Sequence, residues 1–117
     1  MLGFRVFLIA FFVGLLVYTS IVIGNHGPNL MPIFFGDIAA MTWPGQFNCD
    51  FLGFLLLSGL WTAWRHHFTP VGLGLAVLAV FGGMSFLTVY LLTVSFRESG
   101  DINVMLLGKS RAGRLSR

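Results

Sequence analysis

The side chains that could do chemistry are few, and they stand at the edges of apolar segments. Asp50 lies near the start of one such segment, and Arg65, His66 and His67 follow its other end. Arg97 follows the next segment. Ionisable groups inside a membrane span are typical of proton and ion pathways, so Asp50 is the candidate for a gate or ion site. The plainer interpretation is that Asp50 interacts with the dipole at the start of its helix, or pairs with Arg97.

The histidines raise the question of haem or metal binding. His26 follows the first apolar segment, whereas His66 and His67 follow the second. In an antiparallel helix pair these ends lie on opposite faces of the membrane, about 30 Å apart, which is too far to bind one haem iron. We therefore expect histidines beside the lipid headgroups, with no cofactor and no metal. His66 and His67 could still contact a quinone or a metal supplied by a larger complex.

Nucleophilic and phosphate-binding motifs are missing from the sequence. It contains no hydrolase triad, no phosphate-binding loop and no pair of carboxylates at catalytic spacing. Cys49 is the single cysteine, which excludes an intrachain disulfide and a cysteine-rich metal site. Cys49 also has no histidine base on its own segment. The sequence predicts no catalytic residue, and a protein that is not an enzyme.

The composition is typical of a membrane protein. Of 117 residues, 56% are hydrophobic and 9% are charged, against roughly 25% charged in soluble domains. Five of the seven Lys and Arg follow residue 96, and no basic face suited to nucleic acid is predicted. A basic tail next to a membrane helix is expected to interact with anionic lipid headgroups. The residues expected to do so are Lys109, Arg111, Arg114 and Arg117.

These patterns predict an all-α fold, a small polytopic membrane protein in which residues 1–117 form a single membrane domain. Three transmembrane helices are expected at about residues 4–23, 47–64 and 71–94. Residues 32–43 are too short to span, since twelve helical residues reach about 18 Å. They are expected to form a short interfacial or re-entrant helix, and residues 97–117 a basic tail. A secretory signal peptide is the alternative for the first segment.

Small residues recur at helical spacing along the third expected span. They are Gly72, Ala76, Ala79 and Gly83. Such a face lets helices approach one another closely in lipid. We expect it to pack inside the three-helix unit, and a docking face for a partner chain is the alternative.

The basic residues give conflicting evidence on orientation. Three crossings place Arg5 and Arg65 on one side and the five later Lys and Arg on the other, which favours a cytoplasmic C-terminus. Arg5 argues the other way, because it precedes the first span and no basic residue follows until Arg65. A fourth crossing by residues 32–43 would place both termini in the cytoplasm. We expect three crossings and a cytoplasmic C-terminus, in a bacterial cytoplasmic membrane.

Two stretches of the sequence resemble a known family. The first reads Phe-Asn-Cys-Asp-Phe from residue 47, with Leu-Ser-Gly-Leu-Trp and Arg65 after it. The second reads Gly-Gly-Met-Ser-Phe-Leu from residue 82, with Tyr-Leu-Leu from residue 90 and Arg97 after it. Together they resemble a family of small bacterial three-helix integral membrane proteins of unknown function. The resemblance implies a compact set of helices and no particular activity.

The function expected from these features is that of a non-enzymatic accessory or assembly subunit of a larger membrane protein complex. The missing catalytic motifs, the small-residue face and the short loops favour it. One alternative is a minimal oligomeric transporter or channel with Asp50 on a water-filled path. Another is a lipid- or quinone-active membrane enzyme that uses Asp50, His66 or His67. The expected partners are the lipid bilayer and either a larger membrane protein or further copies of this chain.

Overall fold

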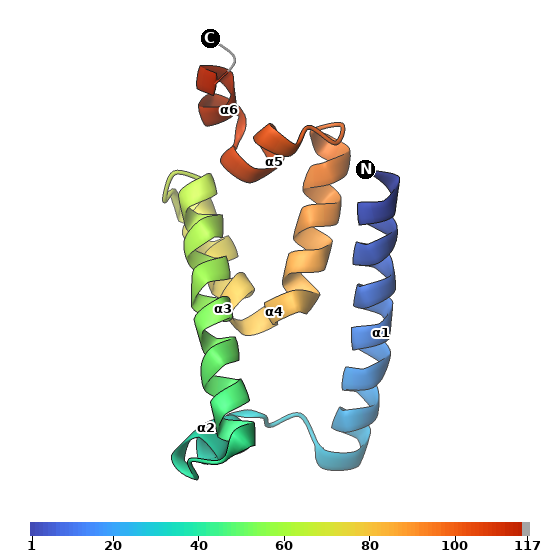
Figure 1. Cartoon of the computed structure of the whole chain (residues 1–117), viewed down its shortest axis with the longest axis vertical. Coiled ribbons are helices and arrows are strands. Elements are labelled where there is room, and N and C mark those ends of the chain that lie inside the picture. The colour runs from blue at the N-terminus through green and yellow to red at the C-terminus, as the bar shows by residue number, and fades with distance from the viewer. Residues whose placement is uncertain (116–117) are drawn as a thin grey trace.

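The fold is helical in every element of the computed structural model, which describes residues 1–115. The elements are α1 (Leu2–His26), α2 (Met31–Ala39), α3 (Trp43–Arg65), α4 (Pro70–Arg97), α5 (Ile102–Leu107) and α6 (Lys109–Leu115). The all-α prediction is therefore confirmed. The molecule is elongated, 52 by 27 by 24 Å, and α1 and α3 run antiparallel along its length (Figure 1).

Two helices in the described part of the chain, α1 and α4, are long and apolar enough to cross a membrane when each is counted over its whole length. α3 is of similar length, with 23 residues, but its first turns carry polar side chains. It begins at Trp43, earlier than predicted, because Pro44 is favoured in the first turn of a helix. α2 is correspondingly shorter than the expected segment 32–43 and ends at Ala39.

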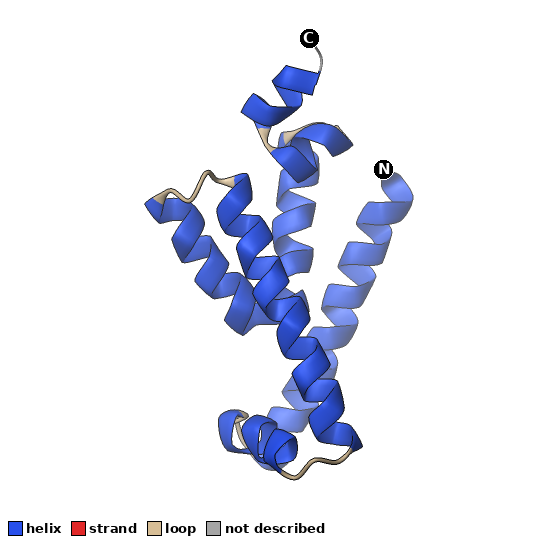
Figure 2. Cartoon of the chain, turned by 60° about the vertical axis from the view of Figure 1, so that its left-hand side comes forward, coloured by secondary structure: helices blue, strands red, loops and turns tan. Residues whose placement is uncertain are grey.

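The prediction of one uninterrupted helix over residues 71–94 is wrong at Gly83. This residue has φ 55° and ψ −134°, a conformation that only glycine adopts readily. It divides α4 into a descending arm, residues 70–82, and a returning arm, residues 84–97, which runs back toward the end of α3 (Figure 1 and Figure 2). Two contacts with His66, one from each arm, establish the reversal. A Cβ on Gly72 would lie 2.6 Å from Cβ of His66, and Tyr90 lies within hydrogen-bond distance of the same histidine.

The reversal gathers the basic residues at one end of the molecule, here called the basic end. Arg5 donates to the carbonyl oxygen of Ser95 at 2.8 Å and to its hydroxyl at 3.1 Å, which ties the start of α1 to the end of α4. Within residues 1–115, all Lys and Arg lie at this end. The opposite end, here called the α2 end, contains α2, the loop at residues 27–30 and the start of α3. The charged residues described there are Asp37 and Asp50.

The buried core is small. The apolar side chains buried within the described residues are Leu8, Ala63, Ala79, Val94, Met105 and Ala112. Most of the larger apolar side chains of α1, α3 and α4 are exposed, which is the reverse of a water-soluble domain. α1 packs on the returning arm of α4, and residues 16–26 of α1 are all exposed. The outer surface is thus suited to lipid or to another protein in the membrane.

Candidate functional site

Arg65 ends α3 and is buried, with 9% of its surface exposed. Its Nε donates to the carbonyl oxygen of Met105 at 2.6 Å, and its Nη2 donates to that of Val104 at 3.2 Å. Both carbonyls belong to α5, near its C-terminal end, where the helix dipole is negative. Nη1 donates to the hydroxyl of Tyr90 at 3.1 Å. No carboxylate in residues 1–115 forms an ion pair with Arg65. The guanidinium is therefore hydrogen-bonded, but its positive charge is not neutralised.

Tyr90 connects Arg65 to His66. The Tyr90 hydroxyl lies 2.6 Å from Nε2 of His66. Because Arg65 donates to the Tyr90 oxygen, the hydroxyl hydrogen is free to be donated to Nε2, and we assign the histidine proton to Nδ1 from this network. Burial, and after it the charge of Arg65, lowers the pKa of His66 below its usual 6.5. The imidazole is therefore neutral at pH 7.

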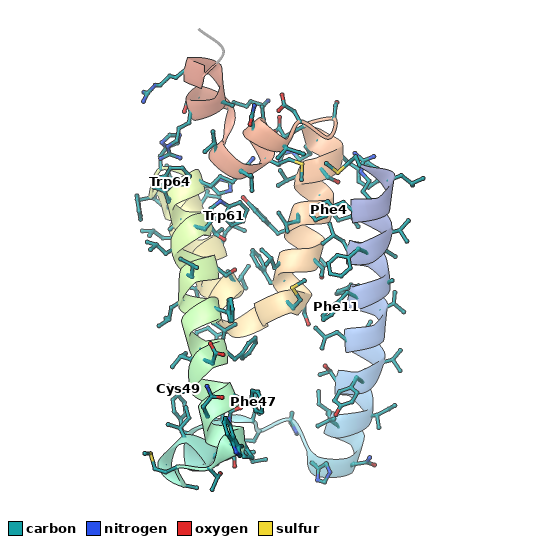
Figure 3. All side chains as sticks on the ribbon, in the orientation of Figure 1. Phe4, Phe11, Phe47, Cys49, Trp61 and Trp64 are labelled. Atoms are coloured by element: carbon teal, nitrogen blue, oxygen red, sulfur yellow. The ribbon has the colours of Figure 1, made fainter. Side chains whose placement is uncertain are left out.

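The C-terminal tail, formed by α5 and α6, covers the side chains of Arg65, His66 and Tyr90. Nε1 of Trp61 donates to a carbonyl of α5 at 3.0 Å, and the guanidinium of Arg111 lies over the Trp64 ring, 3.8 Å from its centroid. The ring nitrogens of His67 lie 3.0 Å from the hydroxyl of Ser110 and 3.2 Å from the guanidinium of Arg111. Figure 3 shows both tryptophans at this end of α3. The tail is thus fixed to the turn between α3 and α4.

A pocket of about 720 Å³ lies between the two arms of α4, beneath the tail. Its apolar lining comes from Val71 and Leu75 on the descending arm and from Phe86, Val89 and Val94 on the returning arm. The pocket exists because Gly83 reverses the chain. A straight α4 would have placed these two groups of side chains at different heights of a single helix.

The rim of this pocket is polar and mainly basic. It is formed by Arg65, His66, His67, Tyr90, Thr93, Arg97, Glu98, Lys109 and Ser110. Three permanent cations therefore face one acid, Glu98. Arg97 and Lys109 form no hydrogen bond or ion pair with another residue of the described chain. The pocket is electropositive at its mouth and apolar beneath.

Four of the residues singled out in the sequence meet at this pocket, namely Arg65, His66, His67 and Arg97. Asp50 does not, because it is exposed on α3 toward the α2 end. The predicted pairing of Asp50 with Arg97 is therefore wrong. That pairing required a straight α4, whereas the fourteen residues of the returning arm carry Arg97 about 20 Å back to the basic end.

The predicted small-residue face lies against α3. The carbonyl oxygen of Ala76 would be 3.2 Å from a Cβ on Gly59, and Gly83 faces Phe51 and Leu55. Ala79 is fully buried. The face therefore serves packing within this molecule.

The basic tail residues have different surroundings. Lys109 lines the pocket, Arg111 lies over Trp64, and Arg114 is exposed. Arg117 lies outside the described residues. Sequence reasoning missed Tyr90, which entered it only as the first residue of the Tyr-Leu-Leu stretch. Its position seven residues before Arg97, two helical turns away on the same face, is the signal that could have identified it.

Neither a metal-ligand cluster within residues 1–115 nor a match to known proteins assigns a function to the chain. Residues 1–115 contain no group of three or more His, Cys, Asp or Glu side chains able to hold a metal ion. Comparison with protein-family models, with curated proteins and with solved structures found no match for the chain. A function for the molecule is therefore inferred from its geometry.

Proposed function

We propose that this integral membrane protein crosses the bilayer twice, through α1 and α3, and enters it a third time with the two arms of α4. In this topology residues 1–5 and the tail lie on the side of the basic end, which the positive-inside rule places in the cytoplasm. We further propose that the protein acts without catalysis, as an accessory or assembly subunit of a larger membrane complex.

The distribution of charge supports this topology. Six Lys and Arg lie at the basic end and none at the α2 end within residues 1–115. The conflict between Arg5 and the later basic residues disappears when all of them share one side. Trp43 and Trp64 lie near the two ends of α3, and their offset of 21 positions along the helix corresponds to a rise of about 31 Å, close to the hydrocarbon thickness. Interfacial tryptophans at this spacing are typical of a crossing helix.

An apolar pocket between α1 and α3 supports the role of accessory subunit. It measures about 490 Å³ and is lined by Phe11 from α1, by Phe54 and Leu57 from α3, and by Met84 next to the reversal. Ser58 is also among its lining residues, and the buried hydroxyl oxygen of Ser58 has no hydrogen-bond partner among residues 1–115. A transmembrane helix of a partner protein would cover these apolar side chains.

The topology is tested by cysteine labelling in intact cells, with Cys49→Ser as the background. Leu2→Cys, Asn29→Cys and Gly113→Cys place single thiols at exposed positions of α1, of the loop after it and of α6. A membrane-impermeant maleimide is expected to label only Asn29→Cys. Three straight crossings would place residues 2 and 113 on opposite sides, so different labelling of those two variants contradicts the proposed topology.

The accessory role is tested by purification from native membranes in a mild detergent, with mass spectrometry of what copurifies. We expect a larger membrane protein in stoichiometric amount. Leu57→Trp, which fills the pocket between α1 and α3, is expected to lose it, whereas Leu78→Trp on the descending arm keeps it. The two leucines are similarly exposed, at 61% and 56%. Recovery of this chain alone would contradict the proposal and favour an oligomeric transporter.

A further inference from the structure

The pocket between the arms of α4 combines unneutralised positive charge with an apolar interior. Arg65 uses three of its five N–H donors on the two α5 carbonyls and on Tyr90. The two remaining donors and the buried charge have no acidic partner within residues 1–115. Arg97 and Lys109 stand unpaired on the same rim. With Glu98 as the one acid, the rim carries an excess of two positive charges, which favours an anionic ligand.

The depth of the pocket indicates that this anion carries a hydrocarbon chain. Along the returning arm, Arg97 at the mouth lies eleven positions after Phe86 at the apolar end, a rise of about 16 Å. In the proposed topology the mouth is at the level of the lipid headgroups, and Phe86 and Leu75 are in the hydrocarbon layer. A small hydrated anion would leave this apolar part uncovered.

We propose that this pocket binds one anionic phospholipid, with the phosphate group beside Arg65, Arg97 and Lys109 and an acyl chain between the two arms of α4. A phosphate oxygen accepts charge-assisted hydrogen bonds from guanidinium and ammonium groups. A zwitterionic headgroup would bring its own cation against three others and is disfavoured. This inference goes beyond a diffuse attraction of the tail to the membrane surface, and it depends on the proposed membrane embedding.

The experiment is native mass spectrometry of the full chain after incubation in mixed micelles of phosphatidylglycerol and phosphatidylcholine. The wild type is expected to retain one phosphatidylglycerol. Arg97→Gln and Lys109→Gln are each expected to lower the retained fraction about tenfold. Arg114→Gln is the matched control, because it removes one tail charge that does not line the pocket, and it is expected to retain the lipid.

The acyl-chain part of the proposal has its own pair of variants. Leu75→Trp fills the apolar part of the pocket and is expected to abolish retention of phosphatidylglycerol. Leu78→Trp, on the same arm but outside the pocket lining, is expected to leave it unchanged. Equal retention in the two variants would show that no acyl chain lies between the arms, and would overturn the proposal.

Three further results would also overturn it. They are equal retention of phosphatidylcholine, a loss in Arg114→Gln as large as in Arg97→Gln, and displacement of the lipid by millimolar inorganic phosphate. The last result would assign the cations to a free phosphate ion. The cysteine labelling described above reads the topology without any added lipid. The labelling therefore distinguishes a wrong proposed topology from an absent lipid site.

Discussion

Arg65 holds the basic end together, because its planar guanidinium bonds two carbonyl oxygens of α5 and the hydroxyl of Tyr90 at once. A lysine ammonium cannot reproduce that fork. A buried cation without an anionic partner is costly, since hydrogen bonds replace only part of its hydration. An anionic ligand beside Arg65 would offset that cost.

His66 makes the stability of the protein depend on pH. Its pKa is lowered first by burial and then by the charge of Arg65. Because its pKa is higher in the unfolded chain, the unfolded chain takes up the proton first, and stability is lost as the pH falls below about 6.5. We expect the melting temperature in detergent to drop between pH 7 and pH 5.

His66→Gln is expected to reduce that drop, and His26→Gln at the α2 end, which is exposed and far from Arg65, is the control. Thermal unfolding followed at several pH values measures both. Equal pH slopes in His66→Gln and the wild type would contradict the assignment.

The contact between α2 and α3 depends on Gly45. A Cβ at this position would overlap the carbonyl group of Asp37, and relief of the overlap would require α2 and α3 to shift apart. We expect Gly45→Ala to destabilise the protein by about 2 kcal/mol. Gly53→Ala on the same helix, where a Cβ meets nothing within 4 Å, should be neutral or stabilising by up to about 1 kcal/mol. Chemical unfolding in micelles compares the two, and equal effects would exclude a close backbone contact.

The reversal of α4 depends on Gly83. Alanine at φ 55° and ψ −134° is strained by about 1–3 kcal/mol, and a straight helix removes the strain. We expect Gly83→Ala to move residue 113 to the opposite side of the membrane, or to lower the amount of inserted protein. Labelling of Gly113→Cys in that background measures it, and Gly74→Ala, which has open space, is the control. An unchanged side and an unchanged melting temperature would show that glycine is not required.

The elements could be predicted where their signals are local. Pro32, Pro44 and Pro70 each stand in the first turn of a helix, and the apolar runs predict α1, α3 and α4. The reversal could not be predicted, because glycine pairs also occur in straight membrane helices. Gly83 instead faces Phe51 and Leu55, about thirty residues earlier in the chain.

The candidate site was predictable only as separate residues. Arg65, His66, His67 and Arg97 stand out because ionisable side chains are rare in this sequence. Their convergence on one pocket follows from the reversal of α4. A straight helix, as predicted from the sequence, would instead put Arg97 at the α2 end, beside Asp50.

At the scale of the whole molecule, the proposed orientation rests on the difference in charge between the two ends. Asn25→Lys combined with Asn29→Lys places two positive charges at the α2 end, where residues 1–115 supply no Lys or Arg. We expect a fraction of the molecules to insert the other way round. Labelling of Gly113→Cys from outside the cell should then rise, and Asn25→Gln with Asn29→Gln is the uncharged control. No rise would show that another feature sets the orientation.

All three tryptophans of the chain belong to α3, at positions 43, 61 and 64. The tryptophan fluorescence of the protein therefore comes from a single helix. Two of the three emitters touch the tail, because Trp61 donates to the carbonyl of Leu106 and Arg111 lies over the ring of Trp64. Release of the tail would remove a hydrogen bond from one indole and a cation from the other, and both changes alter emission. The protein thus carries an unlabelled optical signal for whether the pocket between the arms of α4 is covered or open.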